Sequence, residues 1–131
     1  MSEKELRFAQ DRLYYFQEQE AIVQNFESSG IVLDVGGGGE GIIGRLKGAQ
    51  VVAIDLSKDE LEGAPIGPLK VIMDARDMRF LDATFSAATS FFSLMYIQSF
   101  DHIKVLTEVF RVLIPGSRFF IWDAIIPHRL R

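Results

Sequence analysis

The residues best suited to bind a ligand lie in a glycine-rich segment that follows an apolar run. Asp34 comes two residues before Gly36, and glycine occupies all four positions of 36–39. Such a turn lets the backbone approach a ligand closely, and we expect the N–H groups at the start of the following helix to face that ligand. Gly36, Gly38 and Gly41 also satisfy G-x-G-x-x-G, the pattern of dinucleotide-binding loops.

Two acidic residues help to distinguish between the two candidate ligands, NAD and S-adenosylmethionine. Asp55 ends a second apolar run nineteen positions after Gly36, where a carboxylate can accept hydrogen bonds from both hydroxyls of a ribose. That placement suits NAD and S-adenosylmethionine equally. Asp34 would repel a pyrophosphate but attract the ammonium of a methionine moiety, so it favours S-adenosylmethionine. An NAD(P)-binding oxidoreductase domain is the alternative.

Short apolar runs and helical patterns alternate after residue 30. The expected strands are 31–35, 51–54, 69–73, 87–92 and 119–122, and the expected helices are 41–47, 57–62 and 101–113. Continuous apolar runs are typical of strands buried on both faces of a parallel sheet. We therefore predict an α/β fold, a Rossmann-like open parallel sheet of five strands with helices on both faces. Its ligand crevice should lie at the carboxyl ends of the strands.

The expected helices carry three further signals. Ser57 and Glu60 form an S-x-x-E capping box directly after the second strand. In the helix at 101–113 one face should pack on the sheet, formed by Ile103, Leu106, Phe110 and Leu113. Apolar spacing also predicts a helix over 3–28. This gives an N-terminal helical lid at 1–29 and a cofactor-binding domain at 30–131.

Composition excludes several functions. Eighteen acidic against fourteen basic residues give a net charge of -4, so we expect no nucleic acid and no membrane as partner. The absence of cysteine excludes thiol chemistry and fits a cytoplasmic protein, and two histidines leave little for a metal site.

Five segments together resemble the class I S-adenosylmethionine-dependent methyltransferases, especially the ubiquinone/menaquinone-biosynthesis group. They are VLDVGGG at 32–38, VVAIDLS at 51–57, MDA at 73–75, FSAATSFFSLMY at 85–96 and EVFRVLIPG at 108–116. The resemblance implies methyl transfer from S-adenosylmethionine to a small acceptor by in-line displacement. The apolar residues at 91–96 suggest an apolar acceptor. A non-catalytic cofactor-binding subunit is a further alternative.

The resemblance also implies roles for particular residues. The cofactor-binding set would be Asp34, Gly36, Gly38, Asp55, Leu56, Asp74, Ala75 and Phe91. Within it Asp34 and the two glycines would line the methionine and ribose, and Asp55 would hold the ribose hydroxyls. Asp74 would accept from the adenine amine. The sequence assigns no catalytic base; the candidates are Tyr14, Tyr15, Tyr96, Gln98, His102 and Asp123.

Two departures from the family pattern stand out. The last glycine of the first motif falls at Gly41 instead of at Glu40. Family members also continue with a sixth and a seventh strand, whereas this chain ends at Arg131. We therefore expect the edge of the fifth strand to be covered by another copy of the chain, or the chain to be a fragment.

Overall fold

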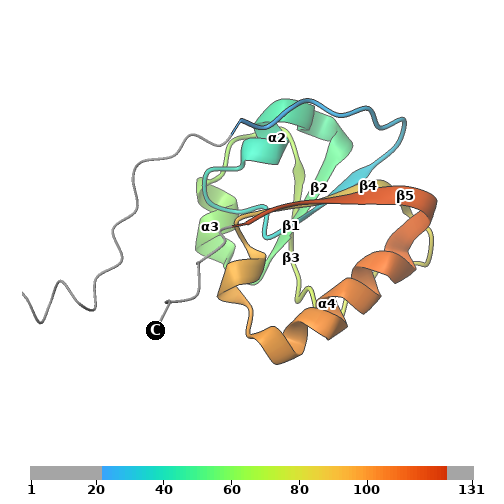
Figure 1. The fold of residues 1–131 in the computed structure, drawn as a ribbon. Helices are drawn as coiled ribbons and strands as arrows, with labels where there is room; N and C mark the ends of the chain where they lie inside the picture. Colours follow the sequence, from blue (N-terminus) through green and yellow to red (C-terminus); the bar gives the residue numbers. More distant parts are fainter. Residues whose placement is uncertain (1–21, 124–131) are drawn as a thin grey trace, which may run out of the picture.

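The computed structural model describes residues 22–123, which form a five-stranded parallel sheet with helices on both faces (Figure 1). The strands are β1 (Val32–Val35), β2 (Val51–Asp55), β3 (Leu69–Ile72), β4 (Phe85–Phe91) and β5 (Leu113–Trp122). Their order is β3-β2-β1-β4-β5, and every neighbouring pair is parallel. The order reverses between β1 and β4, which places the ligand crevice at the carboxyl ends there. The predicted fold class is confirmed.

The helices divide the core into two layers. On one face α2 (Ile42–Lys47) and α3 (Lys58–Gly63) pack against the sheet, and on the other lies α4 (Ser99–Val112) (Figure 1). Short 3-10 helices, η1 (Gly48–Gln50) and η2 (Leu94–Tyr96), follow α2 and β4. Strand β1 supplies both layers, because successive side chains point to opposite faces: Val32 packs with α2 and Leu33 with α4.

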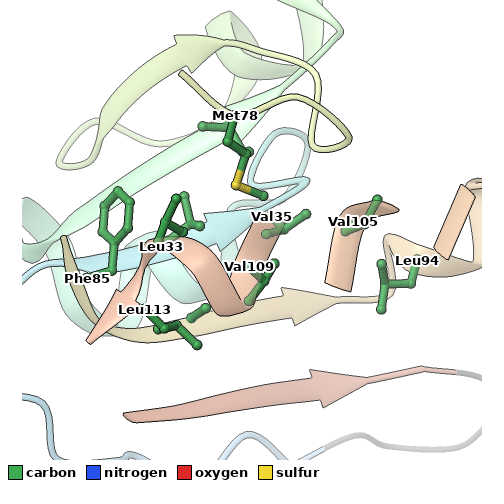
Figure 2. Close-up of a cluster of buried hydrophobic side chains, with 11 residues drawn as sticks. Leu33, Val35, Met78, Phe85, Leu94, Val105, Val109 and Leu113 are labelled. Carbon is green, nitrogen blue, oxygen red and sulfur yellow. The ribbon is translucent and has the colours of Figure 1, made fainter. Parts of the chain in front are cut away.

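The face of α4 that packs on the sheet differs from the predicted one. Val105, Val109 and Val112 are fully buried, while Ile103 and Phe110 of the predicted face are about 70% exposed. Leu113 of the predicted face is buried in the core, at the point where β5 begins. Figure 2 shows Val105 and Val109 directed at the β1 side chains. The helix carries apolar residues on two faces, so periodicity alone could not select the buried one. The β-branched valines fit closest to the sheet.

The predicted helix is also wrong over the described residues 22–28, which have no helical structure. This segment lies along the sheet instead. The Phe26 ring stacks on Phe120 of β5, with 4.7 Å between centroids, and Lys47 donates to the Phe26 carbonyl. The Gln50 side chain donates to two further backbone carbonyls of the segment and its continuation, at 2.5 and 2.6 Å. These tertiary contacts replace helical hydrogen bonds, and the rest of the expected lid lies outside the described residues.

The predicted burial of the strands on both faces is confirmed for the central strand β1 but is wrong for the edge strand β3. All four residues of β1 are buried, whereas Leu69 and Ile72 of β3 are more than half exposed. Strand β5 is the opposite edge, and it starts directly after α4, earlier than predicted. Its pairing with β4 shifts between Leu113 and Arg118, so Pro115 and Gly116 form an irregularity within the strand. Within residues 22–123 no helix is long and apolar enough to cross a membrane.

Candidate functional site

A cavity of about 1080 Å³ lies at the carboxyl ends of β1 to β4. It gathers every residue of the predicted cofactor set: Asp34, Gly36, Gly38, Asp55, Leu56, Asp74, Ala75 and Phe91. They come from four separate segments of the chain. The parallel topology brings these segments together, because all four strands end at the same edge of the sheet.

The glycine loop is held by the protein itself. The amides of Gly36 and Gly37 both donate to the carbonyl of Ile54, at 2.9 and 3.1 Å. Gly38 donates to Asp55 Oδ2 at 3.2 Å, and Gly39 donates to the backbone carbonyl of Glu60 at 2.9 Å. These four amides are therefore bonded within the protein, and the contact of the N–H groups at the start of α2 with a ligand stays a prediction. A diphosphate would find none of these four donors available.

Close packing explains two of the glycines. Gly36 has φ +73°, and a Cβ there would lie 2.4 Å from the Cβ of Ser93. A Cβ on Gly37 would lie 2.7 Å from Asp34 Oδ2 and 2.6 Å from the Ala53 Cβ. A side chain at Gly36 would push the loop away from Ser93, and one at Gly37 would push it away from β1 and β2. The loop is thus shaped to cover Asp34.

Asp34 is a buried acid, with 3% of its surface exposed. The Thr89 hydroxyl on β4 donates to Asp34 Oδ1 at 2.9 Å. Burial raises the pKa of Asp34 to about 7, and the neighbouring Asp55 charge adds to that rise, while the Thr89 hydrogen bond opposes it. Sequence reasoning missed Thr89, although a hydroxyl in an apolar strand was a usable signal.

Asp55 is fixed at the end of β2 by two amides. It accepts from Gly38 through Oδ2 and from Ser57 through Oδ1, at 3.2 and 3.0 Å. The Ser57 hydroxyl caps α3 by accepting from the Glu60 amide at 3.2 Å. The first half of the predicted capping box is therefore present, and Asp55 takes the amide expected to bind the Glu60 side chain. Leu56, 65% exposed, lies beside it in the cavity wall.

Asp74, after β3, is engaged by an arginine that sequence reasoning missed. Arg76 binds both Asp74 carboxylate oxygens, at 2.8 to 3.1 Å, and reaches Asp101 of α4 at 3.2 Å. Its hydrogen bonds hold the pKa of Asp74 below the ordinary value. The group links the β3 side of the cavity to the start of α4. Only the fold could reveal Asp101, which is 25 residues away from Arg76.

The β4 side of the cavity is aromatic. Phe91 contacts Phe92 edge to face, with 4.8 Å between centroids, and lies 5.9 Å from Trp122. Phe92 has φ +51°, a conformation that non-glycine residues seldom adopt and that occurs at functional sites. Tyr96 and Phe100 complete this wall and are 84% and 72% exposed. One cavity therefore joins an acidic half to an aromatic half.

Comparison with known families identifies the domain. The sequence model described as "Methyltransferase domain" matches residues 33–121, which is more than half of the chain. The chain belongs to the methyltransferase domain family. The resemblance to class I S-adenosylmethionine-dependent methyltransferases is confirmed at this level. The likeness to the ubiquinone/menaquinone group and the loss of terminal strands stay predictions.

Individual relatives of this methyltransferase domain agree with the family. An O-methyltransferase from Penicillium expansum is 35% identical over 109 residues, covering 74% of this chain and 39% of that protein. A sterol 4-C-methyltransferase from Caenorhabditis elegans is 44% identical over 55 residues, covering 42% of this chain and 16% of that protein. The chain therefore spans less than half the length of either relative.

A solved structure shares the fold of this methyltransferase domain. An S-adenosylmethionine-dependent methyltransferase from Methanosarcina mazei superimposes with a TM-score of 0.63 at 22% identity. The match covers 73% of this chain and 53% of that one. The fold and the family together support S-adenosylmethionine as the cofactor.

The candidate bases of this methyltransferase domain are scattered. Tyr96 and Gln98 line the cavity, whereas His102 Nε2 is bonded to the Leu94 carbonyl at 2.9 Å outside it. Asp123 does not line the cavity either. The N-terminal candidates, Tyr14 and Tyr15, lie outside the described residues. Among residues 22–123, no three side chains of His, Cys, Asp or Glu are grouped so that they could hold a metal ion.

Proposed function

We propose that this chain binds S-adenosylmethionine in the cavity and transfers its methyl group to a small apolar acceptor. The observation that carries the proposal is Asp34, a buried carboxyl group under a glycine loop whose amides are already bonded. An ammonium group would complement Asp34, whereas a diphosphate would meet carboxylates and four glycine amides, of residues 36–39, that are already bonded within the protein. This contrast favours S-adenosylmethionine over NAD(P).

The adenosine half of the cofactor suits the acidic wall. Asp55 keeps lone pairs for ribose hydroxyls after accepting two amides, since a carboxylate has about four acceptor sites. Leu56 offers an exposed apolar surface for the purine face. Asp74 and the adjoining Ala75 line the expected position of the adenine edge. There Arg76 shares the Asp74 carboxylate, so we expect the adenine amine to compete with Arg76 for it.

The chemistry requires positioning more than acid–base groups. When bound, the sulfonium supplies an activated methyl group for an in-line displacement. The protein must hold the acceptor on the line of attack and exclude water, and such positioning can supply roughly 7 to 11 kcal/mol of the barrier. Phe91 and Phe92 provide an apolar wall beside Asp34 for that purpose. We assign no general base.

The aromatic half supports an apolar acceptor. Phe92, Tyr96 and Phe100 line the cavity, and the last two are largely exposed. Exposed aromatic side chains gain the most from covering an apolar ligand. The names of the relatives, a sterol methyltransferase and an O-methyltransferase, agree with organic acceptors of this kind.

A thermal-shift comparison tests the proposal. Ligand at about 100 times its Kd adds about 2.7 kcal/mol to the free energy of unfolding, which is several degrees for a chain of this size. S-Adenosylhomocysteine should raise Tm and NADH should not. Stabilisation by NADH alone would refute the proposal. Methyl transfer to apolar alcohols or sterols by the purified chain would separate an enzyme from a cofactor-binding subunit.

A further inference from the structure

Among residues 22–123, one side chain is bonded to Asp34, and that partner is neutral. Thr89 donates to Asp34 Oδ1 at 2.9 Å, and no ion pair between residues 22 and 123 includes Asp34. The Oδ2 atom lies under the backbone of Gly37. A carboxylate buried this far without a cation is unfavourable, so the group is driven to hold a proton.

The charged groups around Asp34 increase that tendency. Asp55, at the end of the adjacent β2, is the charged group that acts on Asp34, and it repels a second negative charge. The other charged residues that line the cavity are Glu40, Glu60, Asp74, Arg76 and Asp101. Arg76 is the single cation among these described residues, and Asp74 and Asp101 already bind it. The elements packed against Asp34 therefore supply no positive charge until a ligand brings one.

We propose that Asp34 loses a proton when the ammonium group of the cofactor binds, and that the Thr89 hydroxyl positions the resulting carboxylate. The inference rests on the proposed function and adds the release of one proton to the binding step. The O–H bond at Asp34 Oδ2 breaks, the proton passes to solvent, and the carboxylate pairs with the ammonium group. No bond in the cofactor changes in this step.

Two measurable consequences follow for binding. The affinity for a ligand that carries the ammonium group should fall up to tenfold for each pH unit below about 7, because a proton must then be removed from Asp34. A ligand that has the adenosine part but no ammonium group should bind without releasing this proton. S-Adenosylhomocysteine and 5′-methylthioadenosine form such a pair of probes.

Isothermal titration calorimetry in two buffers of different ionisation enthalpy counts the protons released. With S-adenosylhomocysteine we expect roughly 0.9 protons at about pH 6 and roughly a quarter of a proton at about pH 7.5. With 5′-methylthioadenosine we expect none from Asp34. The Asp34→Asn variant should bind S-adenosylhomocysteine more weakly and release no proton from this site.

The Thr89 variants test the positioning role. Thr89→Val keeps the shape but removes the donor, so the pH of half-maximal proton release should rise by about one unit, the size expected for a lost hydrogen bond to a charged group. Thr89→Ser keeps the hydroxyl and should retain the wild-type profile. A change in packing alone would alter affinity without moving this pH. If the valine variant does not fold, two other results decide the proposal. They are the profile of proton release against pH in Thr89→Ser, expected to match wild type, and the loss of proton release in Asp34→Asn.

The outcomes separate this inference from the proposed function. Binding of S-adenosylhomocysteine with no proton released, and with equal affinity at both pH values, would overturn the proton step alone. Equal proton release by wild type and Asp34→Asn, or release with 5′-methylthioadenosine, would assign the proton to another group and overturn the role of Asp34. Failure of both probes to bind at either pH would overturn the proposed function together with this inference.

Discussion

Three aspartates end three neighbouring strands, or follow them closely, and each has a different environment. Asp34 is buried beside a hydroxyl, Asp55 accepts two backbone amides, and Asp74 is paired with Arg76. Burial favours the neutral form of Asp34, whereas the hydrogen bonds and the charge of Arg76 favour the charged form of Asp74. One residue type therefore provides three different groups within one cavity: a buried acid that can lose a proton, a side chain bonded to two backbone amides, and a carboxylate paired with a cation.

The role of Asp55 gives the first prediction. Asp55→Ala should weaken the binding of S-adenosylhomocysteine by roughly 10- to 100-fold, because charge-assisted hydrogen bonds of about 1.5 to 3 kcal/mol are lost. Calorimetric titration measures this change. Asp59→Ala is the matched control, since Asp59 lies four residues on, is exposed and does not line the cavity. Unchanged affinity in Asp55→Ala would exclude Asp55 from the ligand site.

At the scale of elements, the cavity depends on how the glycine loop and α4 are held against the strands. The loop is bonded to β2 and α3 through its amides, and Ser93 packs against Gly36 from the β4 side. Arg111 of α4 donates to the carbonyls of Met78 and Phe80, each at 2.7 Å, which ties the segment after β3 to the helix. These contacts position the residues of four segments around one cavity.

Gly36→Ala should break this arrangement. The new Cβ meets Ser93 at 2.4 Å, and the backbone has a left-handed φ, so we expect the free energy of unfolding to fall by about 2 to 4 kcal/mol. Gly63→Ala, at the end of α3 with nothing within 4 Å, should be neutral or stabilise by up to about 1 kcal/mol. Urea unfolding of both variants measures the difference. Equal stability of the two variants would contradict the packing described for the loop.

The buried face of α4 gives a second prediction at this scale. Val109→Ala should cost about 2 kcal/mol of unfolding free energy, because a fully buried side chain is truncated. Phe110→Ala removes a much larger side chain but should change stability by less than about 0.5 kcal/mol, since Phe110 is 68% exposed. Thermal or urea unfolding checks both. A larger loss for Phe110→Ala would show that the predicted apolar face is the one that packs.

At the scale of the whole molecule, we expect stability and ligand affinity to change with pH in opposite directions. The chain without ligand should be more stable in acid, whereas its affinity for a ligand with an ammonium group should be higher at neutral pH. The raised pKa of Asp34 means that the folded chain without ligand holds a proton that the unfolded chain has lost between about pH 4 and pH 7. Its stability contribution is therefore full below about pH 4, declines steadily between about pH 4 and pH 7, and is gone above about pH 7. Hydrogen bonds from Arg76 lower the pKa of Asp74, and a hydrogen bond from Arg111 lowers the pKa of Glu108, so their contributions are lost as pH falls below about 4.

The expected result is a stability maximum in mild acid for the chain without ligand. The free energy of unfolding should then decrease by up to about 4 kcal/mol toward pH 8. Asp34→Asn should flatten that decrease, because the amide does not titrate. Urea unfolding of wild type and variant at several pH values measures both curves. A decrease of the same size in Asp34→Asn would rule out Asp34 as its cause.

The edge strand β5 gives one more prediction at this scale. A second copy of the chain covering this edge stays a prediction, supported by the edge position of β5 and the half-exposed Ile121. Ile121→Lys should then lower the mass observed by sedimentation from that of two chains to that of one. Ile103→Lys, on the exposed face of α4, is the control and should leave the mass unchanged. A monomeric wild type at high concentration would refute the prediction.

The sequence by itself determined the five strands of the sheet, the three helices between them and the predicted cofactor set that lines the cavity. Apolar runs, caps and glycines are local signals, and the carboxyl ends of parallel strands must meet, so Asp34, Asp55 and Asp74 could be placed in one cavity. The tertiary structure alone decided which face of α4 is buried and where residues 22–28 run. Only the tertiary structure shows that the amides of the glycine loop are bonded within the protein. The same is true of the partners of Asp34 and Asp74, which are Thr89 and Arg76. Those outcomes depend on competition among contacts between distant segments, which no local pattern in the chain records.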